Sequence, residues 1–410
     1  MTYINRIARS GMLAAASVLG VLALYVLPGY LAPQAEAQAA PRYIFDPTWP
    51  KPLPNKWKMG GVTGLAVDKD DNVWVLNRPN DTLDIEGHAG LNPPTADCCR
   101  RPPALIHISG KTGEVIGSFD AMQGHGMDVD SQGFVYVGSN TVRKYDPKTG
   151  MLVKELPRVP EPQPGGGGRG ADPAKQAALV AAFRAKYPPT TPMIVGGLEE
   201  IRLDEPAREM YVADSYLGGR VLVFDLDTFA FKRGWGAYGK PLSQISLNEA
   251  DHDYTPNGPM PKDFAGHLTL NFSSDGKVYA ADRNANRIHV TDKQGKYLGQ
   301  EFIVAPSTGE GGSTGGVAFS TDPQQRYLII SDLTNNKIWF LNRADGKILG
   351  SFGQMGENGG QWFGLHMIAI DSQGNIYTGE VFNGERVQRF VPADSPRGKQ
   401  LAQAGLQPLT

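Results

Sequence analysis

The stretch Gly126–Asn140, GMDVDSQGFVYVGSN, contains two short runs in which apolar and polar residues alternate, separated by an Asp/Gly turn. Alternation with a period of two is typical of β-strands, and the turn predicts a hairpin. The same pattern recurs in five further stretches, which begin at Gly64, Glu200, Leu268, Val317 and Met367. A third strand, and often a fourth, follows each hairpin. Six such units predict an all-β fold, a six-bladed β-propeller, rather than a β-sandwich or a β-helix.

The last unit lacks its outer strand. The segment Arg42–Trp49, RYIFDPTW, is strand-like, and we expect it to complete that unit and close the ring. The sequence therefore predicts one propeller domain over residues 42–396, followed by a C-terminal tail over residues 397–410.

The N-terminal residues 1–39 are typical of a signal peptide. Two arginines precede the apolar run Met12–Leu27, and small residues in Ala35–Ala40 offer cleavage sites. These features predict a periplasmic or secreted protein. Alternatively, Gly29–Ala32 lengthens the run toward a membrane span, and the segment remains as an uncleaved anchor. The formal net charge of −2 gives no basic footprint, which argues against a nucleic-acid partner.

Three insertions interrupt the repeat, and we expect functional loops among them. They are Pro79–Pro103, Glu161–Pro189, in which a short helix is expected at Pro173–Lys186, and Ser243–Phe264. The first insertion contains the only two cysteines, Cys98 and Cys99. In an oxidising compartment these neighbours form either a vicinal disulfide or an intermolecular link, and otherwise they remain reduced thiols.

Three histidines lie at one register of alternate units. His125 and His366 each stand 11 residues before the aromatic residue of the second strand. His267 stands 12 before it, an additional residue that we assign to the turn at Ser273 and Ser274. Inner strands line the axis of a propeller, so these side chains would lie about 120° apart around it. Three imidazoles with an open fourth position predict a catalytic zinc site. A lone strand histidine is more often a packing residue, and we expect rim or surface positions for His88, His107, His252 and His289.

Second strands should end at the same face, beside the histidines. Arg78, Tyr216 and Arg283 occupy those ends. Two guanidiniums near a metal favour a carboxylate ligand, because each presents a planar fork to two oxygens. A phenol there is a candidate base, with its pKa lowered by the cation and the arginines. The ordinary alternatives are an arginine paired with a neighbouring aspartate and a tyrosine that only packs.

At these residues the chain resembles the NHL-type six-bladed propellers related to peptidyl-α-hydroxyglycine α-amidating lyase. The likeness spans Gly60 to Val391. The segments HGMDVDSQGFVYVG, GHLTLNFSSDGKVYAADRNANRI and LHMIAIDSQGNIYTGE resemble the three zinc-histidine segments of that family. YVADSYLGGRVLVF resembles its catalytic tyrosine segment, and AADRNANRI and VWVLNRP resemble its arginine segments. The resemblance implies that His125, His267 and His366 bind zinc, Tyr216 takes a proton, and Arg283 and Arg78 hold a substrate carboxylate.

The implied activity is zinc-assisted cleavage of the C–N bond of a small-molecule or peptide-derived carbinolamide that carries a carboxylate. The family also holds a structural calcium, here on the main-chain carbonyls of Leu65 and Met127, but Met367 replaces the aspartate that follows its third histidine. Glu199 and Glu200 stand where the family pattern has Thr-Asp, and they could add a carboxylate near the axis. Two other classes stay open: a non-catalytic NHL binding propeller, and a propeller lactonase or hydrolase with an axial Glu/Asn/Asp set.

Overall fold

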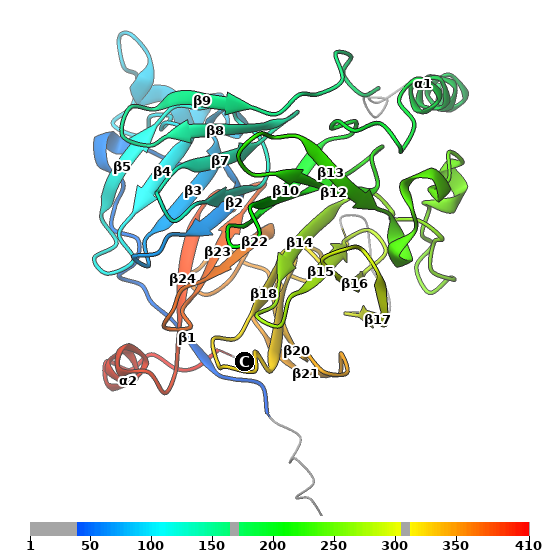
Figure 1. Ribbon diagram of the computed structural model, residues 1–410. Helices are drawn as coiled ribbons and strands as arrows, with labels where there is room; N and C mark the ends of the chain where they lie inside the picture. The colour runs from blue at the N-terminus through cyan, green and yellow to red at the C-terminus, as the bar shows by residue number, and fades with distance from the viewer. Residues whose placement is uncertain (1–38, 165–171, 305–311, 410) are drawn as a thin grey trace, which may run out of the picture. The chain divides into compact units, whose positions relative to one another are not determined.

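The computed structural model describes residues 39–164, 172–304 and 312–409, which form six four-stranded antiparallel sheets in a ring, a six-bladed β-propeller (Figure 1). The predicted export segment lies, apart from Ala39, outside the described residues. No helix within the described residues is long and apolar enough to cross a membrane.

Each blade runs outward from an inner strand in chain order. Blade 1 contains β2 (Gly61–Val67), β3 (Val73–Arg78), β4 (Leu105–Ile108) and β5 (Val115–Phe119). Blade 2 contains β6 (Met127–Val129), β7 (Val135–Gly138), β8 (Val142–Asp146) and β9 (Met151–Glu155). Blade 3 contains β10 (Leu198–Asp204), β11 (Glu209–Asp214), β12 (Arg220–Asp225) and β13 (Phe231–Trp235).

Blades 4 to 6 follow the same order. Blade 4 contains β14 (Leu268–Phe272), β15 (Lys277–Asp282), β16 (Arg287–Asp292) and β17 (Tyr297–Ile303). Blade 5 contains β18 (Val317–Phe319), β19 (Tyr327–Asp332), β20 (Lys337–Asn342) and β21 (Ile348–Phe352). Blade 6 contains β22 (Leu365–Ile370), β23 (Ile376–Glu380), β24 (Val387–Pro392) and, outermost, β1 (Tyr43–Phe45).

The N-terminal strand closes the ring, as the sequence predicts. Tyr43 pairs with Pro392, and Phe45 pairs with Phe390 of β24. The inner strand of blade 1 contacts that of blade 6, so every inner strand has a neighbour on each side. Blade 6 therefore reaches the same four strands as the other blades, with its first and last segments joined by strand pairing.

The core lies between adjacent blades. The repeated aromatic residue of the second strand is fully buried there, and it contacts aromatic rings of the next blade or the closing segment: Tyr136, Tyr211, Tyr279 and Tyr377 are at 0% exposure. The second strands β7, β11 and β19 are buried at every residue. Burial on both faces explains why these strands are almost continuously apolar.

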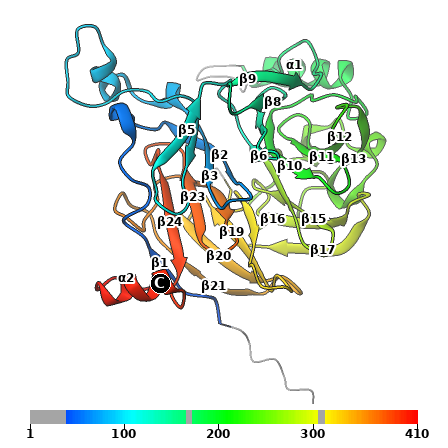
Figure 2. The same cartoon turned by 60° about the vertical axis from the view of Figure 1, so that its left-hand side comes forward.

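Two α-helices in the described part of the chain lie outside the blades. The expected helix at Pro173–Lys186 is present as α1, and the side chain of Asp172 caps its N-terminus. In the stretch predicted as a C-terminal tail, α2 (Pro396–Gln403) packs on β1 and β24 (Figure 2), with Leu401 buried against Ile44 and Val391. Six short 3-10 helices complete the regular structure: η1 (Pro54–Lys56), η2 (Pro79–Asp81), η3 (Asp84–Gly90), η4 (Ala237–Gly239), η5 (Leu242–Gln244) and η6 (Glu249–Asp251).

Two details of the insertions bear on the sequence analysis. Cys98 and Cys99 are joined in a vicinal disulfide within the first insertion. The expectation of rim or surface positions is wrong for His252 and His289, which are buried at 6% and 1% exposure. His252 bonds the carbonyl of Phe264, and His289 contacts Glu301, so both are structural residues.

Candidate functional site

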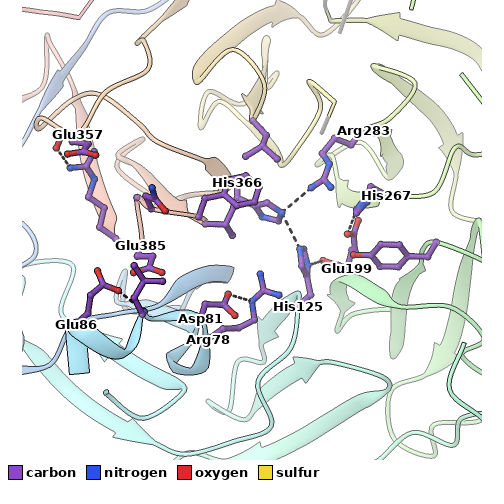
Figure 3. A pocket seen from close by; sticks show the side chains of 18 residues that line it. Arg78, Asp81, Glu86, His125, Glu199, His267, Arg283, Glu357, His366 and Glu385 are labelled. Carbon is purple, nitrogen blue, oxygen red and sulfur yellow. Dashed lines mark hydrogen bonds and ion pairs between the residues drawn. The ribbon is translucent and has the colours of Figure 1, made fainter. Parts of the chain in front are cut away.

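The three histidines predicted from the register lie in one cavity of ≈ 890 Å³ on the propeller axis (Figure 3). His125 precedes β6, His267 precedes β14, and His366 is the second residue of β22. Arg78, Tyr216 and Arg283, which follow or end second strands, line the same cavity. The structure therefore brings together all six residues that the sequence analysis singled out as ligands or catalytic groups.

The reason given for the offset of His267 is wrong. The turns between inner and second strands span residues 130–134, 273–277 and 371–375, so the turn in blade 4 is no longer than the other two. The difference lies before the strand: β22 has a bulge at His366, whereas β14 pairs regularly from Leu268 onward. Because β14 has no bulge, His267 lies just before this strand and one residue further from the tyrosine of the second strand than His366 does. It reaches the cavity from the loop that precedes β14.

Glu199 links two of the histidines. Its main-chain carbonyl accepts a hydrogen bond from Nδ1 of His125 at 2.7 Å, and its carboxylate accepts one from Nδ1 of His267. Burial alone would raise the pKa of Glu199, but the hydrogen bond from His267 and the surrounding positive groups hold that pKa well below its ordinary value. A neutral imidazole that donates from Nδ1 carries its lone pair on Nε2, so the carbonyl of Glu199 fixes the tautomer of His125, and the carboxylate of Glu199 fixes the orientation of His267.

His125 and His366 face each other with their Nε2 atoms 3.3 Å apart. Burial lowers the pKa of His125 to about 4, and burial, His125 and Arg283 hold the pKa of His366 well below 6.5, so both rings are neutral at pH 7. Nη1 of Arg283 donates to Nε2 of His366 at 3.0 Å. Nε2 of His366 thus accepts from the guanidinium in this arrangement, and its lone pair becomes available to a cation only when Arg283 moves away.

The separation of two of the three predicted ligands is compatible with a transition metal. Two nitrogens that each lie about 2.05 Å from a tetrahedral zinc are about 3.3 Å apart, which matches the separation of the two Nε2 atoms. As placed, no three His, Cys, Asp or Glu side chains of the described residues surround one point closely enough to hold an ion. Arg283 contacts His366 where an ion would bind, so that guanidinium must move before His366 becomes a ligand. Nδ1 of His366 is buried without a hydrogen-bond partner.

The arginines of the cavity differ in their partners. Arg78 pairs with Asp81 at 2.9 Å, and Arg386 pairs with Glu380 at 2.7 Å. Arg283 is 7% exposed and, within the described part of the chain, has no carboxylate at ion-pair distance. A buried guanidinium without a counter-ion favours an anionic ligand, because an unpaired buried charge is costly.

Tyr216 is half-open to the cavity, with its ring 4.5 Å from that of His267. The expected lowering of its pKa depends on a bound cation and stays a prediction. Burial is the largest effect and raises the pKa of Tyr216. The negative charge of Glu199 raises this pKa further, and the positive charges of Arg283 and Arg78 oppose both effects more weakly. Tyr216 is therefore a protonated phenol in this state.

Glu200, the second predicted axial carboxylate, does not line this cavity. It pairs with Arg202 at 2.8 Å, and burial raises its pKa to about 7. Nη1 of Arg202 also donates to the carbonyl of Met127 at 3.2 Å. That carbonyl is one of the two ligands that the family resemblance assigns to calcium, and a guanidinium bound to it does not fit a calcium site.

The sequence analysis missed several residues of the cavity. Asp81, Leu83 and Glu86 come from the first insertion, whose path no repeat pattern reveals. Phe382 and Glu385 come from the turn after β23 in blade 6. Aligning that turn with the one that contains Tyr216 would have identified Phe382.

The comparisons bear on the fold. No protein-family profile matches this chain, and no curated protein matches it. Among solved structures, virginiamycin B lyase from Staphylococcus aureus is 13% identical over 82% of this chain and 86% of that chain, with a TM-score of 0.43. A protein of unknown function from Bacteroides thetaiotaomicron is 14% identical over 82% and 70%, with a TM-score of 0.48. Hydrazine synthase from Kuenenia stuttgartiensis is 14% identical over 84% and 82%, with a TM-score of 0.46. Likeness at this level carries no argument about activity, so function must be argued from the cavity.

Proposed function

We propose that this protein is a metal-dependent lyase that acts on a small carboxylate-bearing carbinolamide, in which one carbon carries both a hydroxyl and an amide nitrogen. The observation that carries the proposal is that Nε2 of His125 and Nε2 of His366 lie 3.3 Å apart beside Arg283, a guanidinium without a carboxylate partner among the described residues. Such a site attracts a cation and an anionic substrate group together. The motif resemblance to amidating lyases supports the same class.

The residues that would hold the ion are His125, His267 and His366, because neutral imidazoles favour zinc and its neighbours over calcium. When bound, the ion would act as a Lewis acid that polarises the substrate hydroxyl and stabilises the developing negative charge on its oxygen. Glu199 keeps the ring of His125 in the tautomer that such binding requires and fixes the orientation of His267.

Arg283 binds the substrate carboxylate through its planar fork, and this contact draws the guanidinium away from His366. Tyr216 then moves the protons. In one concerted step the phenol donates its own proton to the departing nitrogen while its oxygen takes the hydroxyl proton of the substrate. The electron pair of the O–H bond forms the carbonyl, and the electron pair of the broken C–N bond stays on the nitrogen. The products are an amide and a carbonyl acid such as glyoxylate, and Tyr216 ends as it began.

The test combines metal content with product release. Purified full-length protein is expected to contain about one transition metal per chain and to release glyoxylate from an α-hydroxyglycine derivative. The triple change of His125, His267 and His366 to alanine should abolish both. The matched control is His88→Ala, because His88 lies in the first insertion and does not line the cavity. Metal content that survives the triple change, or turnover that persists without metal, contradicts the proposal.

A further inference from the structure

Two opposite blades carry an extended turn at the cavity. In blade 3 the carboxylate Asp214 that ends the second strand lies six residues before its partner Arg220, and the two pair at 2.8 Å. In blade 4 the corresponding pair, Asp282 and Arg287, is five residues apart. Blade 6 has the longer spacing, because Glu380 pairs with Arg386, six residues later. Blades 3 and 6 therefore each have one additional residue in a turn that faces the cavity.

The longer turns present aromatic residues at the same repeat position. Tyr216 lies two residues after the strand-ending carboxylate of blade 3, and Phe382 lies two residues after that of blade 6. Both residues line the cavity, and both have left-handed backbone angles, with φ of 50° and 52°. Blades 3 and 6 are three steps apart in a ring of six. Phe382 and Tyr216 thus line the cavity from opposite sides of the axis.

The conformation of Phe382 costs free energy that the fold does not recover. A left-handed backbone angle is unfavourable for an aromatic residue, because its Cβ approaches the following carbonyl oxygen. The turn is held by main-chain hydrogen bonds from Val381 to Gly364 at 2.8 Å and from Gly384 to Phe363 at 3.0 Å. Despite this, the side chain remains 64% exposed and contributes little to the core. Strain at a cavity combined with an exposed apolar ring favours a role in binding.

Further apolar side chains line the same cavity. Leu83, from the first insertion, is 63% exposed, and Leu333 and Val381 contribute buried apolar surface. The carboxylates of Glu86 and Glu385 are also among the lining residues, and Lys58 pairs with both. Lys58 balances both carboxylates and Arg386 pairs with Glu380, so among the described residues this part of the lining offers no unpaired charge to a ligand. An uncharged apolar group fits this lining better than a charged one.

We infer that Phe382 and Leu83 form an apolar subsite that binds an uncharged aromatic or branched acyl group on the nitrogen of the substrate. This inference rests on the proposed function, since Arg283 is taken to hold the carboxylate of the same molecule. The substrate class is thereby narrowed to N-acylated amino-acid derivatives with a bulky apolar acyl group. Free hydroxy acids, which lack the acyl group, leave the subsite empty.

Three unreactive probes separate the two binding features. N-benzoylglycine carries an aromatic acyl group and a carboxylate, N-acetylglycine carries the carboxylate with a small acyl group, and N-benzoylglycinamide carries the aromatic group without the carboxylate. Their dissociation constants for the purified full-length protein can be measured by calorimetry. N-benzoylglycine is expected to bind about tenfold more tightly than N-acetylglycine, because partial burial of the ring removes apolar surface from water.

Phe382→Ala should abolish this tenfold preference while leaving the affinity for N-acetylglycine unchanged. Phe382→Leu should retain most of the preference, because it keeps an apolar side chain at that position. The control is Met151→Ala, which removes an apolar side chain of similar exposure from β9, away from the cavity. Far-ultraviolet circular dichroism checks that each variant is folded.

The outcomes distinguish the subsite from the proposed function. Equal affinities of the unaltered protein for N-benzoylglycine and N-acetylglycine would overturn the subsite. A preference for N-benzoylglycine that survives Phe382→Ala would overturn it as well. Arg283→Ala should remove the advantage of N-benzoylglycine over its amide yet leave the benzoyl preference intact. If Arg283→Ala has no effect while Phe382→Ala acts as expected, the carboxylate role of Arg283 is wrong and the apolar subsite stands.

Discussion

Glu199→Gln provides the sharpest test of how the histidines are held. The substitution leaves the main-chain carbonyl in place, so the hydrogen bond from Nδ1 of His125 is retained. It replaces the carboxylate that accepts from Nδ1 of His267 with a neutral amide. Loss of such a partner typically weakens metal binding 10–100-fold, which corresponds to about 1.4–2.7 kcal/mol. We therefore expect the zinc dissociation constant to rise by that factor.

The assay is competition for zinc against a chromophoric chelator, with the absorption spectrum of the cobalt-substituted protein as a second readout. Glu86→Gln is the matched control, because Glu86 lines the same cavity and pairs with Lys58 without touching a histidine. A double-mutant cycle isolates the contact: in a His267→Ala background, Glu199→Gln should have little further effect. Unchanged zinc affinity in Glu199→Gln, or an equal loss in the His267→Ala background, would refute the argument.

Three further predictions concern the chemistry and the scaffold. Tyr216→Phe should retain the metal and lower turnover by roughly 10²–10⁴, the usual loss for a missing proton-transfer group, as measured by steady-state glyoxylate release with metal content as the control. Asp214→Ala should lower the free energy of unfolding in urea by about 3–5 kcal/mol, because it leaves the fully buried guanidinium of Arg220 with no carboxylate partner among the described residues; a change below 1 kcal/mol would contradict this. Hydrogen bonds from Arg233 lower the pKa of Glu209 to about 2, against the opposing effect of burial. A depressed folded-state pKa contributes stability that is present above the ordinary glutamate pKa of about 4.3 and is lost as pH falls toward 2. Glu209→Gln should therefore flatten the decrease of Tm between pH 5 and pH 2, and identical pH profiles for the two proteins would exclude this contribution.

Much of the scaffold could be predicted because it depends on local patterns. The period-two alternation defined the strands, and the missing outer strand of the last unit identified Arg42–Trp49 as the closing segment. The helix at Pro173–Lys186 could be predicted because Asp172 and Pro173 form a strong start signal, with a capping side chain followed by proline at the first position. The convergence of the three histidines follows from the repeat itself, since equivalent positions of inner strands lie around one axis.

The sequence did not reveal the placement of Glu199 and His267, because both depend on where β-bulges occur. β10 has a register irregularity between Leu198 and Glu200, and this irregularity leaves Glu199 out of the pairing with β11. Glu199 lines the cavity, whereas its neighbour Glu200 pairs with Arg202 elsewhere. A bulge changes which side chain faces the axis without changing residue types, so alternation could not distinguish the two glutamates. The same limitation led to the wrong explanation for His267.

The scaffold and the chemistry use separate residues of the same turns. In blades 3 and 4 the ion pairs Asp214–Arg220 and Asp282–Arg287 are completely buried and close the turns after the second strands. These pairs fix the backbone, and the residue types between them differ from blade to blade. Tyr216 and Arg283 occupy such positions, so their substitution should alter binding or turnover with little loss of stability. Loss of the paired aspartates should instead unfold the blade, and this contrast separates a defect in chemistry from a defect in folding.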